Sequence, residues 1–376
     1  MSAKIYRVAI IGTGMIANFA HLPALMMAGG SVEIVGCADI REHAARETAA
    51  NFKIPQVYTD PQRMLNELKP DIVVVAAPNM HHKDLSLLSL RNGAHVVCEK
   101  PVALRYEDAI ELFSEASNLG LHFFPAQTYR FFNEQMAVKR IVDHGLLGDV
   151  YYAEFDAVRR RGVPRWGFFH IKNENGGGPF CDLGVHQLDY LLWLLGNPEI
   201  LAVSGKTWTK HANTNENIAI ALESSGAFGG MTFTPRPYDW REFDVEDMAA
   251  GCMRLSGDIL INFKTSWAVN LPESYYRKLA GSKAGLIAGD DRPVTIFGSD
   301  CSMLTDIQPQ IVDTSGVPKT FPFPGHVLLW RNVLGVLSGR EEPIVKKEET
   351  LNVTAGIEAF YRSAETGREV LCSDFK

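Results

Sequence analysis

Three side chains that could exchange protons or ligate a metal follow a run of glycines in GGGPFCDLGVHQLDY, residues 176–190. Asp182, His186 and Asp189 have the spacing i, i+4 and i+7, which places them on one face of a helix. Such a face could hold a metal ion, transfer protons, or form the solvated side of a surface helix. The glycines would allow the backbone to bend close to a ligand.

A lysine ends a predicted buried strand in HVVCEKP, residues 95–101. If this strand belongs to a parallel sheet, Lys100 lies at the carboxyl edge, where such sheets bind their ligands. A surface ion pair between Lys100 and Glu99 would explain the same residues, so the motif alone leaves both interpretations open.

A glycine-rich turn lies near the amino terminus, in VAIIGTGMIANF. Its G-x-G-x-x-A pattern, residues 12–17, follows a predicted strand and opens a predicted helix, which is typical of dinucleotide binding. Asp39 ends the second predicted strand, where a carboxylate would hold the ribose diol. This carboxylate favours NAD because it repels a 2′-phosphate, whereas Arg41 keeps NADP possible.

The elements that would position these motifs change character near residue 125. Residues 5–125 alternate apolar strands with helical patterns near 15–29, 41–52, 61–68, 80–92 and 106–119. Continuous apolar runs are typical of strands buried on both faces, so we expect an α/β domain with a doubly wound parallel sheet.

The second half of the chain predicts an α+β domain with a large, mostly antiparallel open sheet. Its expected helices cover 133–145, 182–195, 326–338 and 348–367, and its strand candidates include ILAVSGKTWTK, NIAIALES, DMAAGCMRLS, DILINFKTSWAV and PVTIFGS. We place the domains at 1–125, which would bind NAD(P), and 126–376, which would bind substrate and form oligomer contacts.

Composition narrows the possible partners. The 376 residues are 46% hydrophobic and 22% charged with a net charge of −7, so nucleic acid and anionic membranes are not expected partners. We see no signal peptide and no apolar run of about 20 residues that could span a membrane. The six cysteines form no CxxC pair, which predicts reduced, mostly buried thiols in a cytoplasmic protein.

Together with APNMHH (77–82), FDVED and EAFYRSAETGREV, these motifs resemble the Gfo/Idh/MocA oxidoreductases over nearly the whole chain. The resemblance implies a Rossmann domain, a nicotinamide cofactor in the cleft between two domains, and an open sheet that serves as an oligomer interface, here in a homodimer or homotetramer.

The resemblance also assigns site residues by position. It implies that Lys100, Asp182 and His186 are catalytic, and that Glu99 and Lys100 lie beside the nicotinamide ribose. The remaining cofactor contacts that it implies are Gly12, Thr13, Gly14, Met15 and Ile16 at the pyrophosphate, Asp39 at the adenosine ribose, and Ala77, Pro78, Asn79 and His82 along the cofactor.

We interpret the face formed by residues 182 and 186 as a proton-transfer site and predict no metal, because the sequence has no HExxH or CxxC to supply further ligands. An imidazole titrates near neutral pH, so His186 suits the role of base. Asp182 would orient it or bind substrate, and Lys100 would stabilise a developing alkoxide. Asp189 is expected to have a structural role.

We therefore predict an NAD(H)-dependent dehydrogenase that acts on a secondary hydroxyl of a small-molecule carbohydrate, namely a sugar, polyol or glycoside. One alternative is an NAD-dependent glycoside hydrolase that works by transient oxidation and elimination, on an anionic (sulfonated or carboxylated) glycoside in one version. Another is a non-catalytic ligand sensor.

A basic segment, AVRRRGVPRWGFF, residues 157–169, bears on the substrate. Arg159, Arg161 or Arg165 could bind an anionic substituent, and Trp166 could supply a flat wall for a sugar ring. Alternatively, these arginines form a solvated strand end, or contact the cofactor or a neighbouring subunit.

Overall fold

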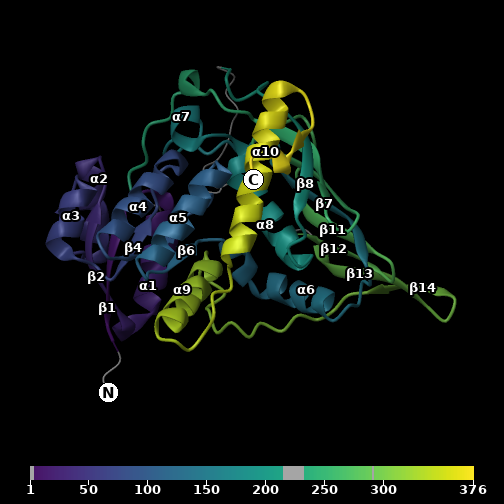
Figure 1. Ribbon diagram of the computed structural model, residues 1–376, viewed down its shortest axis with the longest axis horizontal. Helices are drawn as coiled ribbons and strands as arrows, with labels where there is room; N and C mark the ends of the chain where they lie inside the picture. The colour runs from purple at the N-terminus through teal and green to yellow at the C-terminus, as the bar shows by residue number, and fades with distance from the viewer. Residues whose placement is uncertain (1–3, 215–232, 290–291) are drawn as a thin grey trace.

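A six-stranded parallel sheet forms the amino-terminal half of the protein (Figure 1). The computed structural model describes residues 4–214, 233–289 and 292–376. The strands follow the order β3-β2-β1-β4-β5-β6, the arrangement of a doubly wound Rossmann sheet. They are β1 (Tyr6–Ile11), β2 (Val32–Ala38), β3 (Val57–Tyr58), β4 (Ile72–Val75), β5 (His95–Cys98) and β6 (Phe123–Pro125).

Helices cover both faces of this sheet, as the apolar strands predict. In β1, Val8 and Ile10 belong to one core cluster, whereas Ala9 and Ile11 belong to the cluster on the other face. The helices are α1 (Leu22–Met27), α2 (Glu42–Phe52), α3 (Pro61–Leu68), α4 (His82–Arg91) and α5 (Tyr106–Asn118). Within the expected helix 15–29, a π-helical turn, Ala17–His21, precedes α1.

A nine-stranded sheet forms the second half and is mostly antiparallel, as expected, with one parallel pair, β10 and β7. The predicted strand NIAIALES lies outside the described residues. The sheet order is β14-β13-β12-β11-β7-β10-β9-β8-β15. The strands are β7 (Val150–Val158), β8 (Ile200–Trp208), β9 (Met248–Leu255), β10 (Ile259–Ser266), β11 (Ser274–Gly281), β12 (Gly285–Gly289), β13 (Arg292–Asp300), β14 (Met303–Ile307) and β15 (Val370–Leu371).

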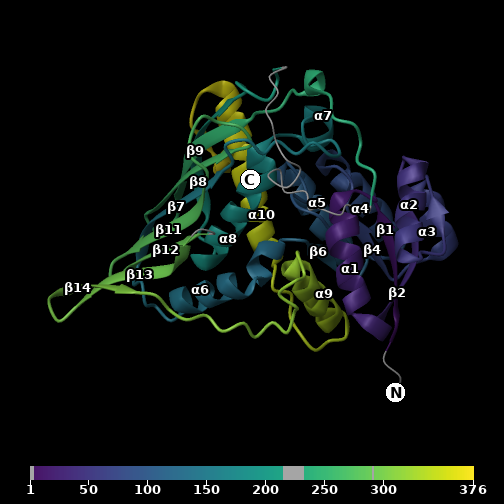
Figure 2. The ribbon, with the colours of Figure 1, turned by 180° about the vertical axis from the view of Figure 1, so that it is seen from behind.

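Helices cover one face of the large sheet, and among the residues that the structure describes no helix covers the other, which we call the open face (Figures 1 and 2). Figures 1 and 2 show α8 (Val185–Leu194) and α10 (Lys347–Thr366) between this sheet and the Rossmann half. Phe180 packs its ring 4.1 Å from that of Phe360 and 4.9 Å from that of Phe263 in this layer. The open face carries polar side chains, among them Glu154, which accepts a hydrogen bond from Tyr276.

The remaining helices are α6 (Asn133–Asp143), α7 (Lys172–Asn175) and α9 (Pro324–Leu337). Although α9 comes late in the sequence, it packs on the Rossmann sheet, where Val327 and Trp330 share a core cluster with Ile10 and Leu25. The domain boundary at residue 125 stays a prediction, but α9 returns across it and brings a late segment of the chain to the end of β5.

The cysteines and the hydropathy agree with the sequence analysis as far as the structure describes them. All six cysteines are free thiols, and four of them are buried: Cys37, Cys98, Cys181 and Cys372. Within residues 4–214, 233–289 and 292–376, none of the helices has both the length and the apolar character that a bilayer crossing requires.

Candidate active site

The glycine-rich turn joins β1 to the helix that follows it, at the carboxyl edge of the Rossmann sheet. Gly12 has φ +92°, and a Cβ there would lie 2.5 Å from the carbonyl oxygen of Ala76, so only glycine fits the turn. A Cβ on Gly14 would meet nothing within 4 Å, because this glycine faces a cavity. The turn therefore leaves its backbone open to a ligand on one side.

Asp39 closes the same turn from the end of β2. Its Oδ2 accepts hydrogen bonds from the backbone N–H of Thr13, at 2.9 Å, and from its hydroxyl, at 3.0 Å. Its Oδ1 accepts the N–H of Arg41 at 2.9 Å. The carboxylate is thus fixed at the cavity wall, where a ribose diol would meet it.

A cavity of about 680 Å³ runs from this turn to the glycine-rich segment of the second half. The structure brings most of the predicted site residues to its wall, from both halves of the chain. Those that line it are Gly12, Gly14, Met15, Ile16, Asp39, Arg41, Ala77, Pro78, Asn79, His82, Glu99, Lys100, Arg159, Trp166, Asp182 and His186. Thr13, Arg161 and Arg165 do not.

Lys100 and Asp182 meet at the far end of the cavity, although they come from different halves of the chain. The Lys100 ammonium donates to the backbone carbonyl of Asp182 at 2.9 Å and to its Oδ1 at 3.2 Å. Burial alone would raise the pKa of Asp182, but the charges of Lys100 and Arg159 outweigh it and hold this pKa below its ordinary value. Asp182 is therefore ionised, and it fixes the lysine in place.

Trp267 completes the hydrogen bonding of this carboxylate and has no counterpart in the sequence analysis. It follows β10, is fully buried, and donates its indole N–H to Oδ2 of Asp182 at 3.1 Å. Both oxygens of Asp182 are thus held, one by a cation and one by a neutral donor. In the sequence, Trp267 could be recognised only as a tryptophan near the end of a predicted strand.

His186 lies one turn after Asp182, on the same cavity wall. Its Nδ1 is buried and has no hydrogen-bond partner among the residues the structure describes. Burial and the nearby Lys100 charge lower its pKa to about 3, well below the ordinary value for an imidazole on which the sequence analysis relied. The ring is neutral at pH 7 and can accept a proton.

The third residue of the opening motif does not join the other two at the cavity. Asp189 is buried and binds Arg130 through both oxygens, at 2.7 Å and 2.5 Å. Glu349 also contacts this guanidinium. The expected structural role of Asp189 is therefore confirmed.

The glycines before this helix serve packing and not a bend beside a ligand. A Cβ on Gly178 would lie 2.1 Å from the carbonyl oxygen of Glu246, and one on Gly177 would lie 2.1 Å from the hydroxyl of Tyr361. Tyr361 donates in turn to Glu246 at 2.8 Å. These close approaches seat the turn that carries Asp182 against the large sheet and α10.

Two residues of the APNMHH segment form hydrogen bonds to backbone carbonyls at the cavity wall. The buried His82 ring lies 2.7 Å from the carbonyl oxygen of Pro101 and 2.8 Å from that of Ala77. Asn79 donates to the carbonyl of Asn175 at 3.0 Å and so joins the two halves of the chain.

Glu99 is surrounded by imidazoles. Its Oε1 lies 2.9 Å from Nε2 of His21 and 3.1 Å from Nε2 of His326, a grouping that could hold a metal ion by composition. However, Nδ1 of His21 accepts the indole N–H of Trp330 at 3.3 Å, so the proton of this ring is on Nε2, and this nitrogen has no lone pair for a metal ion. The arrangement is that of a hydrogen-bonded carboxylate, and the prediction of no metal stays a prediction.

The side chains of the basic segment lie in different places, and only some of them line the cavity. Arg159 and Trp166 line the cavity, whereas Arg161 donates to the carbonyl of Val269 at 3.0 Å and Arg165 stacks 5.5 Å from the ring of Tyr238. Arg161 and Arg165 are thus not among the residues that line this cavity. Arg236, which the sequence analysis missed, lines it and pairs with Glu242.

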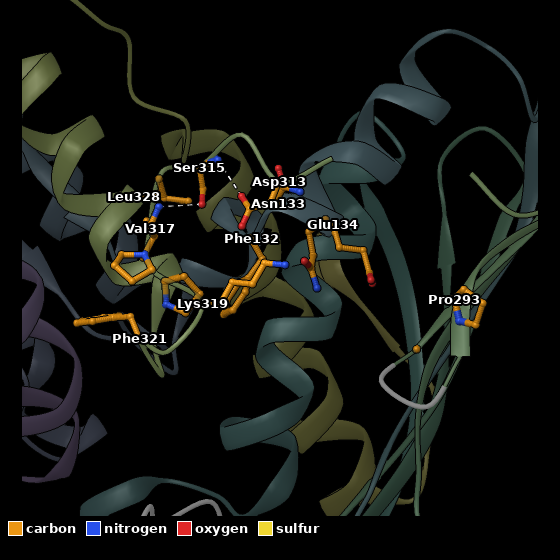
Figure 3. A pocket seen from close by; sticks show the side chains of 14 residues that line it. Phe132, Asn133, Glu134, Pro293, Asp313, Ser315, Val317, Lys319, Phe321 and Leu328 are labelled. Atoms are coloured by element: carbon orange, nitrogen blue, oxygen red, sulfur yellow. Dashed lines mark hydrogen bonds between the residues drawn. The ribbon is translucent and has the colours of Figure 1, made fainter. Parts of the chain in front are cut away.

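A second cavity, of about 700 Å³, lies between the start of α6 and the segment that leads into α9 (Figure 3). Phe132, Lys319 and Phe321 are among the side chains around it. It contains none of the predicted site residues, so we place the chemistry in the first cavity.

The geometry defines an oxidoreductase class: a Rossmann sheet whose glycine turn and acidic strand end fit a dinucleotide, facing a lysine, a carboxylate and an imidazole. Residues 6–127 match the model of the oxidoreductase family with an NAD-binding Rossmann fold, and residues 139–371 match its C-terminal alpha/beta domain. The chain belongs to the Gfo/Idh/MocA oxidoreductase family, and NAD is its cofactor.

Individual relatives agree over nearly the full length. The chain is 30% identical over 373 residues to D-glucoside 3-dehydrogenase of Escherichia coli K12, covering 98% of each chain. An NAD-binding protein from Listeria innocua has a similar structure, with a TM-score of 0.74, 25% identity and coverage of 97% of this chain and 96% of that one. An oxidoreductase domain protein from Kribbella flavida, at 17% identity and TM-score 0.82, shares the fold over 98% and 99% of the two chains.

Proposed function

We propose that the protein is a dehydrogenase that oxidises a secondary hydroxyl of a glucoside or a related sugar with NAD⁺. The observation that carries the proposal is the meeting of Lys100, Asp182 and His186 at one end of a cavity whose other end is the dinucleotide turn. The Escherichia coli relative is a D-glucoside 3-dehydrogenase, which supports the substrate class.

The dinucleotide would lie along the cavity with its pyrophosphate at residues 12–16 and its adenosine ribose on Asp39. Ala77, Pro78, Asn79 and His82 would form the wall beside it, and Glu99 and Lys100 would lie next to the nicotinamide ribose. Bound there, the nicotinamide supplies the hydride acceptor. The turn fits this group because Gly14 leaves its backbone uncovered.

The protein's own residues would move the proton. The substrate loses a hydride from carbon and a proton from its hydroxyl, which gives a ketone, NADH and H⁺. The Lys100 ammonium, fixed by Asp182, would stabilise negative charge on the substrate oxygen and so favour loss of the proton. The neutral His186 ring would accept this proton.

Whether the substrate is anionic or neutral depends on Arg159, one arginine of the basic segment. Arg159 lines the cavity, and its charge acts on Asp182. Of the two readings of the segment, we therefore keep Arg159 and Trp166 as candidate substrate contacts and drop Arg161 and Arg165. Arg236 also lines the cavity, but its charge is already paired with Glu242. We therefore propose a neutral glucoside as the substrate.

The proposal is tested by offering glucose, methyl and aryl glucosides, and glucuronide analogues with NAD⁺. Absorbance at 340 nm reports net NADH, and release of the aryl group reports cleavage. Stoichiometric NADH without aryl release is the expected result. Aryl release with catalytic NAD⁺ and no net NADH would instead indicate the glycosidase alternative, and no reaction of either kind would contradict both.

A further inference from the structure

His326 lies in the first turn of α9, and it reaches the active-site cavity from the last third of the chain. The residue is 4% exposed and forms part of the cavity wall, as do Glu99 and Lys100. Its Nε2 lies 3.1 Å from Oε1 of Glu99. Neither the motifs nor the proposed mechanism uses this imidazole.

The proton positions in this cluster follow from Trp330. An indole N–H can only donate, so Nδ1 of His21 accepts, and the ring proton of His21 lies on Nε2 and points at Glu99. Burial opposes ionisation of Glu99, but the two imidazoles outweigh it and hold the pKa of Glu99 well below its ordinary value. Glu99 is therefore a carboxylate, and its oxygens can only accept.

The same logic fixes the tautomer of His326. Since Oε1 of Glu99 only accepts, the contact at 3.1 Å requires a proton on Nε2 of His326. Burial lowers the pKa of His326, so the ring is neutral and carries only this one proton. Its Nδ1 is then an acceptor, and this atom has no hydrogen-bond partner among the described residues.

The cluster thus holds an oriented imidazole against a carboxylate, and this ring belongs to a residue of the cavity wall and has an Nδ1 acceptor without a partner among the described residues. We infer that Nδ1 of His326 accepts a hydrogen bond from a hydroxyl group of a molecule bound beside Lys100. Two molecules can supply this hydroxyl, namely the nicotinamide ribose of the cofactor and the sugar, and the second of these rests on the proposed function. Glu99 acts as a positioning residue that holds the ring in this tautomer.

The variants test the role of Nδ1 of His326 separately from that of Nε2. His326→Gln keeps an amide N–H at the reach of Nε2, so that the bond to Glu99 can form, but removes the Nδ1 acceptor. His21→Gln is the matched control, because His21 donates to the same oxygen, is 0% exposed, and does not line the cavity. One lost hydrogen bond corresponds to about a threefold to tenfold loss of affinity.

The measurements are the calorimetric Kd for NAD⁺ and the KM for the sugar, in the parental protein and both variants. A higher Kd for NAD⁺ in His326→Gln but not in His21→Gln assigns the ribose hydroxyl. An unchanged Kd with a higher KM in His326→Gln alone assigns the sugar. Parental values for both constants, or equal losses in the two variants, would overturn the inference.

The proposed function can fail separately. If the parental protein oxidises no sugar, the NAD⁺ titration still tests the role of His326. In that case, a Kd for NAD⁺ that is the same in His326→Gln and in the parent overturns the inference. Should His326→Gln not fold, ¹⁵N NMR of histidine-labelled parental protein replaces it, with His326 assigned through His326→Asn. Its Nδ1 resonance must move when NAD⁺, or NAD⁺ with sugar, is added, and a stationary resonance refutes the role.

Discussion

Trp267 donates its indole N–H to Asp182 across 3.1 Å, and so the strand-end tryptophan of the large sheet orients the carboxylate that holds Lys100. We expect Trp267→Phe to lower kcat/KM by about tenfold, because a hydrogen bond to a charged group is lost while most of the ring volume stays. The Kd for NAD⁺ should not change. Steady-state kinetics with calorimetry checks this, and a parental kcat/KM would show that Asp182 needs no such donor.

Asp39 should carry the adenosine ribose. Asp39→Ala removes two hydrogen bonds that Thr13 makes and the acceptor for the diol, so the Kd for NAD⁺ should rise by roughly tenfold to a hundredfold. Glu42→Ala is the control, because Glu42 is an acid on the same loop-to-helix segment and pairs with Arg46. Equal affinities of Asp39→Ala and the parent would defeat the assignment.

His186 should be the principal proton acceptor. His186→Ala should lose about 10²- to 10⁴-fold in kcat and keep its affinity for NAD⁺. Since the pKa of His186 is about 3 in the free protein, the base form is present above that value and is lost only as the pH falls through it. The kcat/KM of the parental protein should therefore not fall near pH 6.5 because of His186. A fall near pH 6.5 that is present in the parent and absent from His186→Ala would contradict the low pKa.

Buried neutral histidines should make the protein less stable in mild acid. Burial lowers the folded-state pKa of His82 and His186 below 6.5, so the unfolded chain binds more protons once the pH drops beneath that value. Their contribution is complete above pH 6.5 and is lost as the pH falls toward the folded-state pKa. Calorimetric Tm values should therefore decrease from pH 7 to pH 5, whereas a flat Tm over this range would contradict the shifts.

The open face of the large sheet should mediate a homodimer or homotetramer. This prediction rests on the family resemblance and on a sheet whose outer face no helix covers in the part of the chain that the structure describes. Light scattering should give a multiple of 41.7 kDa, and Glu154→Arg, on that face, should reduce the mass. Glu107→Arg, on exposed α5 surface, is the control. A single species at the chain mass would refute the prediction.

Local spacing predicted the parts of the site that are local in the chain. The turn at Gly12 and Gly14, the acid that ends β2 and the pair Asp182 and His186 each depend on a few neighbouring residues, and each lies where its motif indicates. In the same way, the uninterrupted apolar run of β4 was enough to predict a strand buried on both faces.

The rest depends on contacts between distant segments. Trp267 reaches Asp182 through the packing of β10, His326 reaches the cavity through the packing of α9, and no spacing in the sequence links them to Asp182 or Glu99. The low pKa of His186 is a product of burial beside Lys100, which a motif cannot express. Arg161 and Arg165 shared a motif with Arg159, but backbone carbonyls and a tyrosine ring hold them elsewhere.

The position of α9 bears on how this chain can be cut and recombined. A fragment that ends near residue 125 would leave Ile10 and Leu25 without the apolar cover that Val327 and Trp330 provide, and would lose the imidazole of His326. Chimeras that exchange the cofactor half between relatives should therefore carry residues 324–337 along with it. The apolar core on one side of the Rossmann sheet is thus discontinuous in sequence, since it contains residues from the first third of the chain and from one late helix.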